Sequence, residues 1–267
     1  MNNIVGILPA AGIAKRMQPY SGPKELLPVG YHPVQVGIET KLIPMAVSQY
    51  MINAMAKADI RNIYFVLSPQ KWEIFKFFKS GAYWGIHFGY LCQDEPVGMP
   101  GALDSAYPWL QNQVVVMGMP DTIVEPADCF LQLLRFHTEK KAHLTLGIFP
   151  TQNPQALAPV HVDPTTNRVK EIFDKPAMPL YFNTWGIAAW APAFTELLHD
   201  YVDRSTKQRQ QHELLLSDIF SEAIVQGMDV YGYIFPHGKF YDIGTPEGLI
   251  QSRLALEYQL SSSKISE

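Results

Sequence analysis

A short apolar run followed by a loop of small residues opens the chain and decides the fold: Ile4-Val5-Gly6-Ile7-Leu8-Pro9-Ala10-Ala11-Gly12-Ile13-Ala14-Lys15-Arg16-Met17. Residues 4–8, stopped by Pro9, predict a buried first strand. The small residues after it would let backbone N–H groups approach a phosphate, whose oxygens the planar guanidinium of Arg16 could clamp. The loop fits neither the Walker A nor the dinucleotide-binding glycine pattern. Alone, it indicates either an anion site after the first strand or an ordinary turn.

Strands and helices alternate along the first half of the chain. Apolar runs predict strands at 63–67, 87–91 and 114–117; helical spacing predicts helices at 43–58, 68–80 and 101–110, after an irregular loop that reaches about residue 31. This alternation favours right-handed βαβ units and a mostly parallel sheet, which binds ligands beyond the carboxyl ends of its strands. The loops after Leu8, Leu91 and Met117 should therefore converge on one site.

The pattern changes at Ala142, where strand-like pieces are joined by turns. These pieces are residues 144–149, 160–162, 169–173 and 182–190, and helices resume at about 194–201, 212–226 and 246–260. A polar tail is expected at 261–267. We interpret the second half as an extension of the sheet with a substrate-facing subdomain, within one domain spanning residues 1–260.

Composition and charge argue against several classes of protein. The chain has 267 residues, a net charge of −4 and a pI near 6.1, so it has no basic field for nucleic acid or an anionic membrane. No apolar stretch reaches the about 18 residues of a membrane span, and the start lacks a signal-peptide pattern. Cys92 and Cys129 have no CxxC spacing or nearby histidine, which argues against a zinc site. We expect a cytoplasmic protein that binds neither nucleic acid nor membrane.

A second stretch strengthens the case for an anion site: Gly22-Pro23-Lys24-Glu25-Leu26-Leu27-Pro28-Val29. Lys24 lies between two prolines, whose rigidity would fix its position. Two cations about eight residues apart in one irregular loop, Arg16 and Lys24, would suit a triphosphate, whose charge must be offset at several points. The alternative is a solvated surface loop with incidental charges.

These two stretches, A-A-G-x-x-x-R-M and P-K-E-L-L-P-V, resemble the signature loop of the sugar-1-phosphate nucleotidylyltransferases, most closely that of the glucose-1-phosphate thymidylyl- and uridylyltransferases. Further segments follow in the order of that family. Residues 93–103 resemble the strand end that recognises the base in that family, and residues 117–121 resemble the strand end that carries a metal-binding aspartate. Three further segments resemble the E-K-P element (171–176), the N-x-G-I element (183–187) and the W-x-D-x-G-T-P-E element (240–247). The resemblance covers roughly residues 4–254.

The resemblance implies an α/β fold: a three-layer, Rossmann-like (glycosyltransferase-A-like) nucleotidyltransferase fold with a mostly parallel mixed sheet and a small substrate-facing β subdomain. Residues 1–141 would form the nucleotide-binding half and 142–260 the sugar-phosphate-binding half. The implied reaction joins a nucleoside triphosphate, with dTTP or UTP favoured, to a sugar 1-phosphate and releases pyrophosphate. A homo-oligomer is expected by analogy.

The resemblance also assigns roles to individual residues. Three residues would be catalytic: Arg16 would offset charge on the pyrophosphate, Lys24 on the α-phosphate and Lys175 on the sugar phosphate. The nucleotide would be bound by Ala10, Ala11, Gly12, Gln93, Gly98 and Asp121. The sugar would be bound by Asp174, Asn183 and Gly186. Asp121 and Asp242 would together hold Mg²⁺. Among the tryptophans, Trp185 is the candidate for stacking on a sugar.

Several residues depart from the family pattern and leave the sugar open. Ala14 stands where glycine is usual, which costs of order 1 kcal/mol if its φ is positive. Asp174 replaces a glutamate, Pro120 replaces a glycine, and residues 30–41 form a longer connection. A cytidylyltransferase on the same scaffold and a non-catalytic sugar-nucleotide sensor are the alternatives. A sensor would be expected to lack one of the charged residues assigned above, and none is missing.

Overall fold

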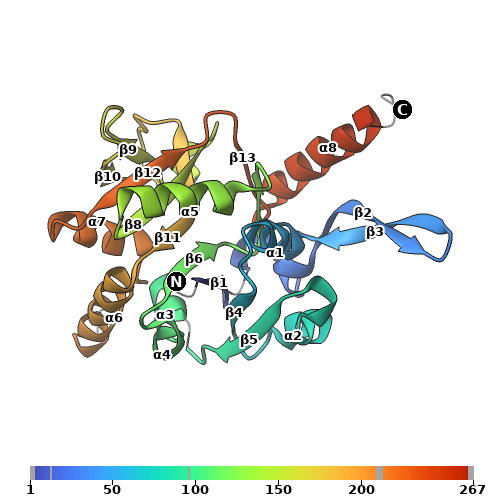
Figure 1. Cartoon of the computed structure of the whole chain (residues 1–267), viewed down its shortest axis with the longest axis horizontal. Coiled ribbons are helices and arrows are strands. Elements are labelled where there is room, and N and C mark those ends of the chain that lie inside the picture. The colour runs from blue at the N-terminus through green and yellow to red at the C-terminus, as the bar shows by residue number, and fades with distance from the viewer. Residues whose placement is uncertain (1–3, 13, 96, 209–212, 264–267) are drawn as a thin grey trace.

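A seven-stranded sheet forms the centre of the molecule (Figure 1). The computed structural model describes residues 4–12, 14–95, 97–208 and 213–263. The sheet order is β12 (Val230–Ile234), β8 (Leu144–Pro150), β11 (Asn183–Trp190), β6 (Val114–Gly118), β1 (Ile4–Ala10), β4 (Asn62–Leu67) and β5 (His87–Cys92). All neighbours are parallel except β11, which is antiparallel to both β6 and β8. This confirms the mostly parallel mixed sheet.

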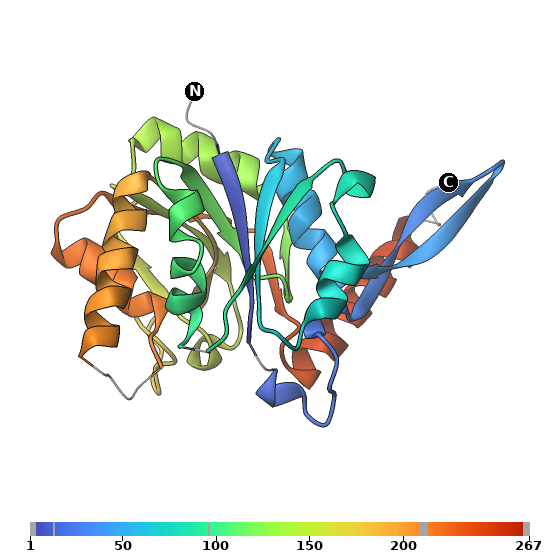
Figure 2. The ribbon, with the colours of Figure 1, turned by 90° about the horizontal axis from the view of Figure 1, so that it is seen from below.

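Helices cover both faces of the sheet and make three layers (Figure 2). One face carries α1 (Val47–Lys57), α2 (Trp72–Phe78) and α5 (Cys129–Lys140); the other carries α3 (Met99–Asp104), α4 (Tyr107–Leu110), α6 (Pro192–Lys207) and α7 (Leu216–Val225). Successive side chains of a strand point to opposite faces, so Ile7 and Met117 pack under α3 and α6 while Leu8 and Val116 pack under α1 and α5. The three-layer Rossmann-like fold is confirmed.

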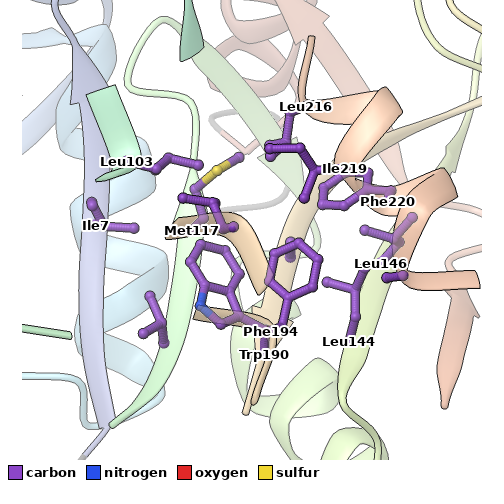
Figure 3. Packing of buried hydrophobic residues seen from close by; sticks show 14 of the residues in the cluster. Ile7, Leu103, Met117, Leu144, Leu146, Trp190, Phe194, Leu216, Ile219 and Phe220 are labelled. Carbon is purple, nitrogen blue, oxygen red and sulfur yellow. The ribbon is translucent and has the colours of Figure 1, made fainter. Parts of the chain in front are cut away.

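Aromatic side chains fill the core under α6 and α7 (Figure 3). Trp190 on β11 and Phe194 on α6 pack at 5.6 Å between ring centroids, and Phe194 meets Phe220 of α7 at 5.8 Å. The indole N–H of Trp190 donates to Thr195 Oγ1 at 2.9 Å, so its one polar atom is satisfied. Each fully buried aromatic of this kind contributes about 1.5–3 kcal/mol.

A long β-hairpin projects from the body beside the C-terminal helix (Figures 1 and 2). It consists of β2 (Pro28–Val36) and β3 (Glu39–Ala46), and α8 (Pro246–Ser263) packs against β2. The helix predicted from residue 43 is wrong for 43–46, because Pro44 favours an extended residue before it. The helix begins at Val47, where the Gln49 side chain accepts the Ala46 N–H at 2.7 Å.

Other boundaries also differ from the sequence predictions. The helix predicted at 101–110 is split into α3 and α4, because Pro108 has no N–H to bond the carbonyl of Asp104. Pro9 does not stop β1, α2 begins at Trp72 rather than Ser68, and α8 includes the first three residues of the predicted tail. The sequence analysis missed α5, β7 (Thr122–Glu125), β12 and β13 (Lys239–Asp242).

The second half carries a small antiparallel ribbon formed by β9 (Val160–Val162) and β10 (Val169–Ile172). This ribbon is the small β subdomain that was expected. The helix predicted at 212–226 is described as α7 only from Leu216, and residues 209–212 lie outside the described ranges. Among the described helices, none is both long and apolar enough to cross a bilayer.

The buried histidine of α5 predicts a pH dependence of stability. His137 is buried beside Thr145, with Nδ1 and Oγ1 2.9 Å apart, and burial lowers its pKa to about 4. In the unfolded chain a histidine has a pKa of about 6.5, so as the pH falls the unfolded state takes up the proton first. His137 therefore stabilises the fold fully above pH 6.5, and about 3 kcal/mol should be lost between pH 6.5 and 4. Urea unfolding across this range measures the loss.

A His137→Gln variant is the control, since its side chain does not titrate. Its stability should fall less than that of the wild type over the same pH range. Equal losses in wild type and His137→Gln would contradict the assignment.

Candidate active site

The loop after β1 forms two short 3₁₀ turns, η1 (Lys15–Met17) and η2 (Lys24–Leu26), at the carboxyl end of the central strands. Ala10 and Ala11 turn their methyl groups into the two cores, whereas Gly12 is exposed. A Cβ on Gly12 would meet nothing within 4 Å. The backbone beyond Ala11 is therefore open to a ligand, as the sequence led us to expect, and phosphate binding at these three residues stays a prediction.

Two aspartates from distant parts of the sequence lie side by side. Strands β7 and β13 pair antiparallel with Asp242 opposite Thr122, and the Ile243 N–H donates to the Asp121 carbonyl at 2.9 Å. Gly244 lies between the two carboxylates: a Cβ there would be 2.8 Å from Asp242 Oδ1 and 3.0 Å from Asp121 Oδ2. Only glycine leaves this space open.

Each of these aspartates is paired with one cation of the loop. Lys24 Nζ forms a short ion pair with Asp121 Oδ2, and Arg16 Nη1 lies 3.2 Å from Asp242 Oδ2. Arg16 Nη2 also borders the space at Gly244, 3.0 Å from the position of a Cβ there. We call these four residues, Arg16, Lys24, Asp121 and Asp242, the charge cluster. The structure thus brings together four of the residues that the sequence analysis assigned.

Burial and ion pairing have opposite effects on the pKa values of Lys24 and Asp121 in the charge cluster. Burial works to lower the pKa of Lys24, but the charge of Asp121 and its hydrogen bond outweigh burial and raise the Lys24 pKa above its ordinary value. For Asp121, burial works to raise the pKa, and the Lys24 charge outweighs it, so the Asp121 pKa is lowered. Both groups are therefore ionised at neutral pH.

The turn that carries Arg16 starts from a strained residue. Ala14 has φ +50° and ψ +38°, the left-handed conformation that non-glycine residues adopt at a cost of about 1–2 kcal/mol. Because φ is positive, the departure from the usual glycine does carry the cost that the sequence analysis foresaw.

Ala14→Gly is accordingly expected to raise the free energy of unfolding by about 0.5–1 kcal/mol, since relief of the strain exceeds the about 0.4–1 kcal/mol of added unfolded-state entropy. Thermal unfolding should show Tm higher by about 1–2 °C. Ala58→Gly, at φ −89°, is the matched control and should lower Tm. A lower Tm for both variants would contradict the role given to Ala14.

The residues assigned to the base lie after β5, at the same sheet edge. Gln93 is 8% exposed, its N–H donates to the Leu67 carbonyl at 2.8 Å, and its Nε2 has no hydrogen-bond partner among the described residues. Gly98 has φ +90°, and a Cβ on it would be 2.5 Å from the Leu214 carbonyl oxygen. A buried amide without a partner is costly, which makes Gln93 a candidate for ligand binding.

The residues assigned to the sugar are placed differently. Asp174 and Lys175 lie exposed after β10, and no ion pair among the described residues joins Lys175 to the charge cluster. The Asn183 amide accepts the Val160 N–H at 2.8 Å and donates to the Val160 carbonyl at 3.0 Å. A Cβ on Gly186 would press on Phe240 and Phe149. Asn183 and Gly186 therefore hold β11 in place, and their contact with a sugar stays a prediction.

Trp185 does not offer a stacking surface. It is 7% exposed and meets Phe220 edge to face at 5.3 Å within the core under α7. The suggestion that it stacks on a sugar is wrong, because β11 is a central strand and Trp185 points to its covered face.

A second buried ion pair beside the charge cluster escaped the sequence analysis. Lys71, just before α2, places Nζ 2.6 Å from Oε1 of Glu25 in η2, and both side chains are buried. Glu25 belongs to the stretch that marked the loop, but no motif pointed to Lys71. The local sequence around it, Ser68-Pro69-Gln70-Lys71, begins the helix predicted at 68–80, and nothing in it marks Lys71 as buried.

The chain matches the nucleotidyl transferase family over residues 9–259. It is 23% identical over 257 residues to a low-salt glycan biosynthesis nucleotidyltransferase of Haloferax volcanii, covering 94% of this chain and 66% of that protein. It is 22% identical over 253 residues to the mannose-1-phosphate guanylyltransferase of Mycobacterium tuberculosis, covering 94% and 64%. The chain thus spans about two thirds of the length of these curated relatives or slightly less.

Solved structures share the architecture. A Bacillus anthracis crystal structure, named as a glucose-1-phosphate thymidylyltransferase in complex with sucrose, superposes with a TM-score of 0.78 at 20% identity, covering 95% of each chain. At this identity the likeness supports the fold. The family match spans nearly the whole chain and includes the last two residues of β1, the loop, both aspartates and β13. The chain therefore belongs to the nucleotidyl transferase family.

Proposed function

We propose that the protein transfers a nucleotidyl group from a nucleoside triphosphate to a sugar 1-phosphate, giving a nucleoside diphosphate sugar and pyrophosphate. The charge cluster is the observation that carries this proposal. Two cations suited to phosphate oxygens and two carboxylates suited to a metal ion meet around Gly244, at the carboxyl ends of parallel strands. Family membership and the names of the relatives support it.

The pairing within the charge cluster suggests how substrates enter. Without substrate, each aspartate is neutralised by a lysine or an arginine, so no buried charge stands alone. A nucleoside triphosphate bound to a metal ion carries both signs of charge. Its phosphates would pair with Lys24 and Arg16, and its metal ion would bind Asp121 and Asp242. Each of the four side chains would then replace its present ion-pair partner with a group of the substrate complex.

The two carboxylates fit a magnesium ion. Among the residues that the structure describes, no group of three or more His, Cys, Asp or Glu side chains is placed to hold a metal. Mg²⁺ is commonly held by only one or two protein carboxylates and completes its shell with substrate phosphates and water. The open space at Gly244 between Asp121 and Asp242 suits that arrangement. When bound, the ion would neutralise charge that builds up on the α-phosphate.

The side chains of the chain would supply position and electrostatics. The sugar phosphate is already an anion, so it needs no general base, and the obstacle is repulsion between two anions. Lys24 would hold the α-phosphate, Arg16 the leaving pyrophosphate and Lys175 the sugar phosphate, stabilising the charge that develops in the transition state. Lys175 must approach the charge cluster from its loop after β10 for this to hold.

For the base we favour dTTP or UTP, read by the amide of Gln93 and the backbone at Gly98. The Nε2 of buried Gln93, which has no partner among the described residues, could donate to a base carbonyl, and its Oε1 could accept from a base N–H. The nucleotide-binding half would be residues 1–141 and the sugar-phosphate half 142–260, in one domain. A homo-oligomer in the cytoplasm is part of the same proposal.

A substrate panel tests the function. Purified protein with Mg²⁺ is offered each of dTTP, UTP, CTP, GTP and ATP with a set of sugar 1-phosphates, and pyrophosphate release is followed. Release with dTTP or UTP, dependent on a sugar 1-phosphate and abolished by a chelator, is expected. Turnover with CTP alone would overturn the base assignment, and binding of sugar nucleotides without turnover of any pair would favour a sensor.

A further inference from the structure

The buried pair of Glu25 and Lys71 adjoins the charge cluster, because Glu25 follows Lys24 in sequence and both charges of the pair act on residues of the cluster. Glu25 is 1% exposed and Lys71 is 6% exposed, and Nζ lies 2.6 Å from Oε1. The pair joins η2 to the connection between β4 and α2, two loops that share the carboxyl edge of the sheet. Ionised groups are rarely buried this deeply without a specific reason, because their desolvation is costly.

Two hydrogen bonds tie Glu25 and Leu27 to the start of α1. The Ser48 hydroxyl at the start of α1 donates to the Glu25 carbonyl at 2.7 Å, and the Val47 N–H donates to the Leu27 carbonyl at 2.9 Å. The backbone of η2 is thus tied to α1 while its buried side chain is tied to Lys71. Because Lys24 is the residue before Glu25, these contacts fix the base of the Lys24 side chain.

The pair also acts on the charge cluster electrostatically. The negative charge of Glu25 helps to raise the pKa of Lys24, after the larger effects of burial and Asp121. The positive charge of Lys71 helps to lower the pKa of Asp121. Lys71, Glu25, Lys24 and Asp121 therefore influence one another in one buried region, where burial raises the pKa of Glu25 and the charge of Lys71 opposes that effect.

One atom of the pair is left without a partner. Glu25 Oε2 is buried and accepts no hydrogen bond from the described residues. In the protein without substrate, the ammonium of Lys24 is paired with Asp121 and not with Glu25 Oε2. If Asp121 held a metal ion, Glu25 Oε2 would still be an acceptor without a partner among the described residues.

We propose that Lys71 is a positioning residue for nucleotidyl transfer: held on Glu25, it keeps η2 and the carboxylate of Glu25 in the place where they direct the Lys24 ammonium to the α-phosphate. This inference rests on the proposed function and adds a residue that neither the motifs nor the comparisons point to. Lys71 touches no substrate in this account and acts through Glu25 and Lys24.

Three variants test the proposal: Lys71→Met, the double variant Glu25→Leu with Lys71→Met, and Lys207→Met as a control at an exposed pair on α6. Each is measured for Tm and, with the best substrates of the panel, for kcat and KM. Lys71→Met leaves Glu25 buried without its partner, so Tm should fall by on the order of 10 °C. The double variant replaces both charges by apolar groups of similar volume and should regain most of that Tm.

Stability and catalysis should separate in the double variant. If the pair positions Lys24, kcat should stay about 10- to 100-fold below wild type although Tm has recovered, and KM for the triphosphate should change by less than about threefold. Wild-type kcat in the double variant would overturn the proposal, since the pair would then serve stability alone. If Lys71→Met fails to fold, kcat of the double variant still tests whether the pair positions Lys24.

The control variant and the wild type show whether a negative result concerns the role of the ion pair or the proposed function itself. Lys207→Met should match wild type in Tm and kcat, because exposed ion pairs contribute little. A wild type that turns over no substrate pair would overturn the proposed function and this inference with it. An active wild type with an equally active double variant would overturn this inference alone.

Discussion

Asp121→Ala is expected to lower kcat/KM for sugar-nucleotide formation by about 10³-fold. The change removes one of the two carboxylates that flank Gly244 and leaves the Lys24 ammonium buried without its partner. Loss of one preorganised electrostatic group at a reacting phosphate costs about 10²–10³ in rate, and loss of a metal ligand adds to that. Steady-state pyrophosphate release at saturating Mg²⁺ gives the value.

Asp203→Ala is the matched control for this prediction. Asp203 also forms a short lysine pair, 2.6 Å from Lys207, but on the exposed surface of α6, so its loss should leave kcat/KM unchanged. Circular dichroism must show that Asp121→Ala folds. A folded Asp121→Ala protein with kcat/KM within about threefold of wild type would remove Asp121 from the site.

Lys24→Gln should show the next largest effect, a fall in kcat of about 10²–10³-fold, because the α-phosphate would lose its nearest cation as charge develops in the transition state. The pH profile should change as well. The charge of Lys24 holds the pKa of Asp121 below its ordinary value, so without it that pKa rises and the acidic limb of kcat/KM moves to higher pH. Initial rates between pH 5 and 9 measure both effects.

Lys41→Gln, on the exposed hairpin, is the control for loss of a lysine charge. It should retain the wild-type kcat and pH profile. If Lys24→Gln kept its kcat but raised KM for the triphosphate, Lys24 would bind the ground state and the transition state equally, contrary to the role given to it.

The position of the site could be predicted because it follows from local patterns. The apolar run of β1, the small residues after it and the alternation of strands with helices predict a parallel sheet with a ligand edge. The resemblance then assigned Asp121 and Asp242. Their proximity depends on the pairing of β7 with β13, two short strands that no apolar pattern predicted.

Residues whose role depends on tertiary contacts could not be predicted. Lys71 has the sequence surroundings of a surface lysine, and only the folding of η2 against the β4–α2 connection buries it. Asn183 lies in a segment that resembles a sugar-binding element, but only the structure shows that its amide also bonds the backbone of Val160. The hairpin was missed because its prolines and polar residues obscure the strand alternation.

The stoichiometry of the reaction tests the central claim most directly. Wild-type protein, Mg²⁺, one triphosphate from the panel and one sugar 1-phosphate are incubated, and sugar nucleotide and pyrophosphate are quantified by mass spectrometry. We predict equal amounts of the two products, none without the sugar 1-phosphate and none in the Asp121→Ala, Asp242→Ala double variant. Pyrophosphate formed without the sugar 1-phosphate, or products formed equally well by the double variant, would contradict the account.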